Sequence, residues 1–177
     1  MAGMSVRQSK KSQWPAGSKF ARPEDSVGFL LWQTLHRWQR YATAGLADLD
    51  LTHMQFTVLA AIGWLSREAA PPIQTAVADH CQLDAMTVSQ LVRTLEKKGF
   101  VARTAADRDA RAKAVSLTGA GTAALAAALP RIDEMDRAFF APADVDALMR
   151  ELGAVYRGPA AGRSGAADDE AGRSREN

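Results

Sequence analysis

The stretch LDAMTVSQLVRTLEKKGFVARTAADRDARAKAVSLTGAG, residues 83–121, joins an amphipathic helical pattern to an alternating basic one. Asp84 stands where an N-cap is expected and Gly99 supplies a left-handed stop, so we expect a helix that ends at about Lys98. Residues 100–104 and 113–117 alternate apolar and polar side chains, which predicts two short strands joined by the loop ADRDAR. The sequence therefore predicts a helix followed directly by a hairpin.

The predicted helix has two chemically different faces. Its apolar positions follow the spacing i, i+3, i+4 and i+7 and are expected to face a core; they are Val88, Leu91, Val92 and Leu95. The opposite face and its flanks carry Met86, Thr87, Gln90, Arg93, Thr94 and Lys97. Amide, hydroxyl and cationic groups read base edges and phosphates in a major groove. An ordinary solvated face is the alternative, but we expect such a face to carry more acid than the single Glu96.

Helical patterns also surround this stretch. In LTHMQF, Thr52 and Gln55 have capping-box spacing, and Leu51 with Phe56 can form a hydrophobic staple. The helices expected from these and similar signals span residues 24–47, 53–65 and 74–81 before the stretch and 119–140 and 143–155 after it. Pro130 is expected to interrupt the fourth of these, and Pro142 to start the last.

A short helix, a turn, an amphipathic helix and a basic hairpin in this order describe a winged helix-turn-helix. The fold class expected is therefore mainly α, with N- and C-terminal helices flanking the winged helix. Residues 84–113 hold seven basic and four acidic side chains, a local excess of +3. We expect the helix to enter a major groove of DNA and the hairpin tip to lie on the backbone or in the minor groove. A solvated charged hairpin is the alternative.

Composition sets outer limits on the function. The 177 residues fit one domain with tails, are 47% hydrophobic, and carry a net charge of only +2. The sequence has one cysteine, Cys81, no apolar run long enough for a membrane span and no signal-peptide core, so a cytoplasmic location is expected. The three histidines lack metal-ligand spacing, and no catalytic motif is visible, so we expect no metal, no cofactor and no enzymatic activity.

Three regions are expected along the chain. Residues 1–23 are polar with five basic side chains and are interpreted as a flexible basic arm, or alternatively as an extension without a role. Residues 24–155 form the winged-helix domain with its flanking helices. Residues 156–177, rich in Gly, Ala and polar side chains, are expected to be a disordered tail.

The stretches LTHMQFTVLAAI, DAMTVSQLVRTLEKKGFV and DRDARAKAVSLTGAG resemble the MarR (multiple antibiotic resistance regulator) family of transcription factors, over about residues 26–155. The resemblance implies a homodimer whose terminal helices, here residues 24–47 and 119–155, build the dimer base. It also implies a pseudo-palindromic DNA operator and a repressor released by a small phenolic or lipophilic effector or by cysteine oxidation.

By position, the resemblance carries groove-facing roles onto Thr87, Ser89, Gln90 and Arg93. It also matches Asp109 and Arg111 to the family's Asp-x-Arg wing, whose arginine contacts the minor groove. Thr94, Lys97, Arg108 and Lys113 complete the DNA-binding residues that we expect. A salt bridge within the wing is the alternative role for Arg111. The chain departs from the family at Gln82, where the turn often has glycine; a left-handed Gln82 would cost about 1–2 kcal/mol.

An aromatic stripe is the candidate effector site. Its members lie on the first two predicted helices and are Trp32, His36, His53, Phe56 and Trp64. Aromatic walls with a few polar groups suit a flat lipophilic acid, although such a stripe is more often core. Trp38 is assigned to the core. Cys81 is interpreted as small core packing rather than a redox sensor, because reactive thiols need exposure and a nearby cation.

The leading hypothesis is therefore a DNA-binding transcriptional regulator with an operator of its own. The alternative is a winged helix that serves as a protein-interaction or dimerisation module without an operator. Saturable, salt-sensitive DNA binding distinguishes the two.

Overall fold

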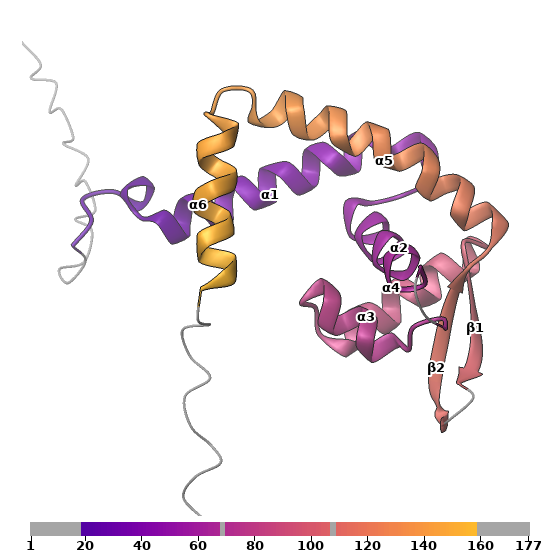
Figure 1. Cartoon of the computed structure of the whole chain (residues 1–177). Coiled ribbons are helices and arrows are strands. Elements are labelled where there is room, and N and C mark those ends of the chain that lie inside the picture. The colour runs from indigo at the N-terminus through magenta and orange to yellow at the C-terminus, as the bar shows by residue number, and fades with distance from the viewer. Residues whose placement is uncertain (1–18, 68–69, 107–108, 159–177) are drawn as a thin grey trace, which may run out of the picture. The chain divides into compact units, whose positions relative to one another are not determined.

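The computed structural model describes residues 19–67, 70–106 and 109–158, apart from the side chains of residues 105–112. A short 3-10 helix, Pro23–Asp25, precedes the first α-helix, and a second one, Ala47–Leu49, follows it. The remaining elements are α1 (Val27–Gly45), α2 (His53–Leu65), α3 (Gln74–Cys81), α4 (Ala85–Lys97), β1 (Val101–Ala106), β2 (Asp109–Leu117), α5 (Gly119–Phe140) and α6 (Val145–Arg157). This mainly helical order with one hairpin confirms the predicted winged helix-turn-helix (Figure 1).

The predicted starts of α2 and α4 are confirmed, and each is defined by a local cap. The Thr52 side chain accepts the Gln55 N–H while the Gln55 side chain accepts the Thr52 N–H, so α2 begins at His53. The Asp84 carboxylate caps α4 by accepting the Thr87 N–H at 2.8 Å. Gly99 has a φ of 74°, the left-handed value that ends the helix. Each of these signals acts within a few residues.

Two predictions about proline are wrong. Pro130 lies inside α5, which runs from Gly119 to Phe140 without interruption. Pro130 has no N–H to donate to the Ala126 carbonyl. Both residues are exposed, so water can satisfy that carbonyl instead. The last helix starts at Val145 and not directly after Pro142, because the Asp144 carboxylate caps it by accepting the Ala147 N–H at 2.9 Å.

Other boundaries shift by a few residues. The first helix begins at Val27, because Ser26 accepts the Phe29 N–H, and ends at Gly45. Both hairpin strands are longer than predicted, and a register shift falls between Ala105 and Ala106. α6 continues to Arg157, into the region expected to be a tail. The rest of that tail, residues 159–177, and residues 1–18 of the arm lie outside the described residues.

The hairpin is supported by a segment that the sequence analysis left open. Ile73 forms an isolated antiparallel bridge with Ala114, and the Val115 N–H donates to the Pro72 carbonyl at 2.9 Å. Pro72 and Ile73, in the segment between α2 and α3, therefore form an extended edge beside β2. This edge ties the start of α3 to the hairpin.

The core lies between α2, α3, α4 and the hairpin, which gather on one side in Figure 1. Its largest fully buried side chains are Leu46, Leu59, Ile62, Leu95, Val58, Val77, Val88, Val92 and Val115. Trp38 packs against this core, as predicted. The chain divides into two compact units after Met135, inside α5. Within its described residues, no helix is long and apolar enough to cross a membrane.

Candidate nucleic-acid interface

The α4 helix buries its apolar face and exposes its polar one. Val88, Val92 and Leu95 are fully buried, and Leu91 packs against the core. The exposed side chains are Met86, Gln90, Arg93, Thr94 and Lys97, while Thr87 and Ser89 are half-buried. The structure therefore leaves the predicted groove-facing surface open. Met86 is 72% exposed, which adds an apolar group to this surface.

Two threonines on α4 use their hydroxyl protons within the helix. Thr87 Oγ1 donates to Asp84 Oδ2 at 2.6 Å, and Thr94 Oγ1 donates to the Gln90 carbonyl at 3.0 Å. The bond from the Thr87 hydroxyl, followed by the Thr87 N–H, lowers the pKa of Asp84 and keeps the cap ionised. Both threonine hydroxyls can then accept a hydrogen bond from a base but have no proton left to donate to a phosphate. The donors on this face are the Gln90 amide, the Arg93 guanidinium and the Lys97 ammonium.

An ion pair attaches the hairpin to α4. Arg103 of β1 donates from Nε to Glu96 Oε2 at 2.9 Å, and its Nη2 forms an ion pair with the same oxygen. Hydrogen bonding from Arg103 lowers the pKa of Glu96, with a smaller electrostatic contribution from Lys113. Arg103 is therefore neutralised by the one acidic residue of the helix face. The Arg103 guanidinium therefore holds the hairpin against α4 and is not an unpaired cation.

The hairpin tip contains the remaining predicted DNA contacts. Arg108 lies outside the described residues, as do the side chains of Asp109 and Arg111, whose backbone belongs to β2. Lys113 is exposed and pairs with Ala105 in the antiparallel register. Contacts from this tip to a minor groove stay a prediction.

The turn between α3 and α4 adopts the conformation that glycine favours. Gln82 has a φ of 52° and a ψ of 41°, so it is left-handed despite its side chain. Its amide Nε2 donates to the Asp79 carbonyl at 2.7 Å, and the Leu83 N–H donates to the Ala78 carbonyl at 3.0 Å. These two bonds satisfy the last carbonyls of α3 and offset part of the strain.

A cavity of about 800 Å³ lies beside the winged helix. Apart from the polar Thr57, Arg67, His80 and Cys81, it is lined by Phe56, Ala60, Ala61, Gly63, Trp64, Leu117, Leu125 and Leu129. The Arg67 guanidinium lies 3.4 Å from the centre of the Trp64 ring, a cation–π contact. The lining is thus mainly apolar, with one aromatic–cation pair. Burial raises the pKa of the Cys81 thiol, which lowers its thiolate fraction.

The cavity contains only part of the predicted aromatic stripe. Phe56 and Trp64 line it, whereas its lining does not include Trp32, His36 or His53. Trp32 and His36 stack on α1 with ring centres 4.4 Å apart, and the His53 ring lies 5.9 Å from Trp38. Burial lowers the pKa of His53.

The sequence analysis missed other lining residues of the cavity. Leu117 and Leu125 come close to α2 only through the fold: the Cβ that an alanine would add at Gly63 lies 2.9 Å from Leu125 Cδ2. No local pattern signals such a contact.

These features define a winged helix-turn-helix DNA-binding protein. The model of the MarR family matches residues 49–112. A curated relative, the uncharacterized HTH-type transcriptional regulator YdcH of Bacillus subtilis, is 44% identical over 126 residues, 71% of this chain and 86% of the relative. The chain belongs to the MarR family of transcriptional regulators.

Solved structures share the fold. A probable transcriptional regulator from Pseudomonas aeruginosa is 30% identical with a TM-score of 0.67, covering 77% of this chain and 98% of that one. The Staphylococcus aureus MepR–DNA complex is 22% identical with a TM-score of 0.65, covering 75% and 94%. The family is a class of DNA-binding regulators and not of enzymes.

Proposed function

We propose that the protein is a homodimeric repressor that binds a pseudo-palindromic operator through α4 and the hairpin. The observation that carries this proposal is the exposed row Gln90, Arg93 and Lys97 on a helix whose opposite face packs on the core. A helix fixed in this way presents donors to a major groove with little freedom to move. The Arg103–Glu96 ion pair holds the hairpin beside it.

The proposed DNA contacts divide by chemistry. Gln90 and Arg93 read bases, while Lys97 and Lys113 contact phosphates. Arg111, or Arg108 in its place, enters the minor groove. The complete proposed set is Thr87, Ser89, Gln90, Arg93, Thr94, Lys97, Arg108, Asp109, Arg111 and Lys113.

Exposed apolar side chains on the terminal helices support the homodimer. On α1 they are Val27, Leu30, Leu31, Trp32 and Leu35, and on α6 they are Val145, Met149, Leu152, Val155 and Tyr156. Exposed apolar rows of this size indicate an interaction surface on each helix. A second copy of the chain would cover both rows.

The cavity supports a small lipophilic or phenolic effector. Its apolar walls and the Trp64–Arg67 pair suit a flat aromatic acid, the carboxylate meeting the guanidinium. Effector and DNA would then favour different spacings of the two α4 helices, and each would shift the population away from the other. Because half-sites lie one helical turn apart, a small reorientation abolishes the fit.

We expect Trp64→Ala to weaken effector binding about tenfold, because it removes one aromatic wall of the cavity. Thermal shift with a panel of aromatic acids, including cinnamate and 4-hydroxybenzoate, measures the change. Trp32→Ala, at a tryptophan of similar exposure on α1, is the comparison variant. Each shift is measured from that variant's own unfolding temperature without effector, because Trp32 also lies in the proposed dimer row. A larger loss in Trp32→Ala than in Trp64→Ala would place the effector on the α1 stripe instead.

The experiment that tests the proposed function is a gel-shift titration with DNA upstream of the protein's own gene, together with sedimentation. We expect a dimer, saturable binding with a two-fold footprint, and affinity that falls steeply with salt as counterions are released. A monomer without saturable binding would contradict the proposal and favour the protein-interaction module.

A further inference from the structure

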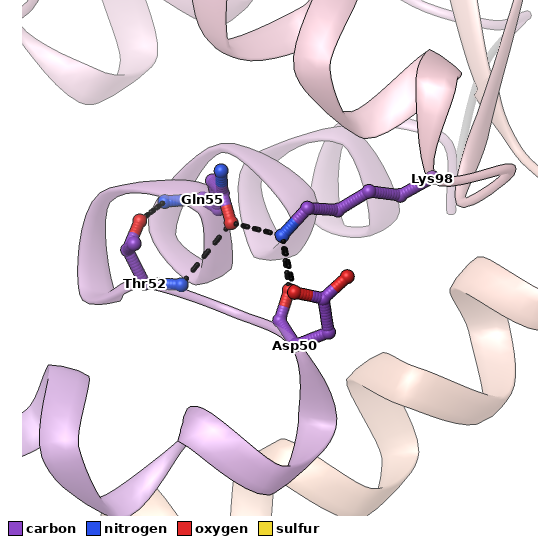
Figure 2. Close-up of polar contacts among 4 residues, drawn as sticks. All are labelled: Asp50, Thr52, Gln55 and Lys98. Carbon is purple, nitrogen blue, oxygen red and sulfur yellow. Dashed lines mark hydrogen bonds and ion pairs between the residues drawn. The ribbon is translucent and has the colours of Figure 1, made fainter.

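Lys98, the C-cap residue of α4, contacts residues far away in the sequence (Figure 2). Its Nζ donates to Asp50 Oδ1 at 2.9 Å, to Gln55 Oε1 at 3.1 Å and to the Asp50 carbonyl. An ammonium group has three protons, and these three acceptors use all of them. The Lys98 side chain is only 21% exposed. This lysine is therefore turned inward, unlike its exposed neighbour Lys97.

The receiving site is organised by the residues around it. Asp50 is left-handed, with a φ of 53°, and is flanked by the buried Leu51. Gln55 is 8% exposed, and its Oε1 also accepts the Thr52 N–H at 3.1 Å, within the capping box of α2 (Figure 2). The Gln55 acceptor is thus held in place by the start of α2, and Asp50 stands at the end of the 3-10 helix that precedes it.

The same junction is also tied to α5. Asp48, in the 3-10 helix Ala47–Leu49, forms an ion pair with Arg131. Asp48 and Asp50 therefore connect this short helix to α5 on one side and to the end of α4 on the other.

We propose that Lys98 is a positioning residue for DNA binding, which acts through Asp50 and Gln55 and does not contact DNA. The proposal rests on the proposed function, since it concerns the same DNA-reading helix. The Asp50 side chain is 74% exposed, and ion pairs with so exposed a partner contribute little to global stability. The main consequence of the contact is the fixed position of the α4 end.

For the variant Asp50→Asn, the change in net charge and the loss of positioning shift DNA affinity in opposite directions. Asp50→Asn keeps a residue type that tolerates the left-handed region but removes a negative charge. If only net charge mattered, DNA binding would tighten. Positioning predicts that Asp50→Asn weakens binding about tenfold and that Lys98→Met does the same. The double variant should lose no more than Lys98→Met alone, because that change already removes every bond that Asp50 accepts from Lys98.

The salt dependence of affinity supplies the matched control. Lys98→Met should keep the wild-type slope of log affinity against log salt, because no phosphate contact is lost. Lys97→Met, at the exposed neighbour, should lower the magnitude of that slope by about 0.9. If Lys98→Met lowered the slope and Asp50→Asn tightened binding, Lys98 would be a direct phosphate contact and the proposal would be overturned.

Amide hydrogen exchange of the full-length free protein tests the contact without an operator. Lys98→Met and Asp50→Asn should both speed exchange at residues 46–51 and 92–100, while Lys97→Met leaves both segments unchanged. Unchanged exchange in both variants would overturn the proposal. If the wild-type protein bound no duplex specifically, the proposed function would fail. Amide hydrogen exchange would still show whether the Lys98–Asp50 contact holds the end of α4 in place.

Discussion

A Gln90→Ala/Arg93→Ala double variant is expected to lose sequence-specific DNA binding, with affinity for the operator falling by at least about thirtyfold. Each good contact of an amide or guanidinium with a base edge contributes about 1–3 kcal/mol of discrimination. Both side chains are exposed on α4, so their removal leaves no cavity in the core. Binding to non-specific DNA should fall much less, since only one cation is lost.

Competition gel shifts with specific and random duplexes measure this ratio, and thermal unfolding verifies the fold. Arg150→Ala is a charge-matched control, an exposed arginine on α6 outside the proposed contacts. It should leave the preference between duplexes unchanged. An equal loss of specific and non-specific affinity in the double variant would show that α4 does not read bases.

Gly121→Ala is expected to destabilise the protein by about 3 kcal/mol, because α5 passes directly against the backbone at the start of the hairpin. A Cβ at Gly121 would lie 2.8 Å from the carbonyl carbon of Phe100 and 3.2 Å from its Cα, and closer still to its oxygen. These are backbone atoms that cannot rotate away. The same Phe100 carbonyl accepts the Thr118 N–H at 3.1 Å, so relieving the clash also disturbs the start of α5.

Gly119→Ala is the matched control in the same turn of helix. A Cβ there meets no atom of the described residues within 4 Å. Since alanine favours a helix more than glycine does, this variant should be as stable as the wild type or slightly more stable. Urea unfolding measures both, and equal stability of the two variants would contradict the predicted close approach.

Short-range signals explain what the sequence analysis predicted correctly. The Thr52–Gln55 capping box, the Asp84 cap and the Gly99 stop each act within one helical turn, and all three are present in the structure. The two faces of α4 follow from its periodicity alone. The interior of α5 and the start of α6 show the limit: local rules weighed Pro130 and Pro142 too heavily against an exposed carbonyl and a capping aspartate.

The amino-acid sequence by itself determined the order of elements, the polar face of α4 and the membership of the family, because these depend on spacing along the chain. Only the tertiary structure decided which polar groups are already engaged: Arg103 by Glu96, and Lys98 by Asp50 and Gln55. It also decided which aromatic residues meet in the cavity. The physical reason is that such contacts join different elements, whose approach is set by the packing of the core rather than by spacing along the chain.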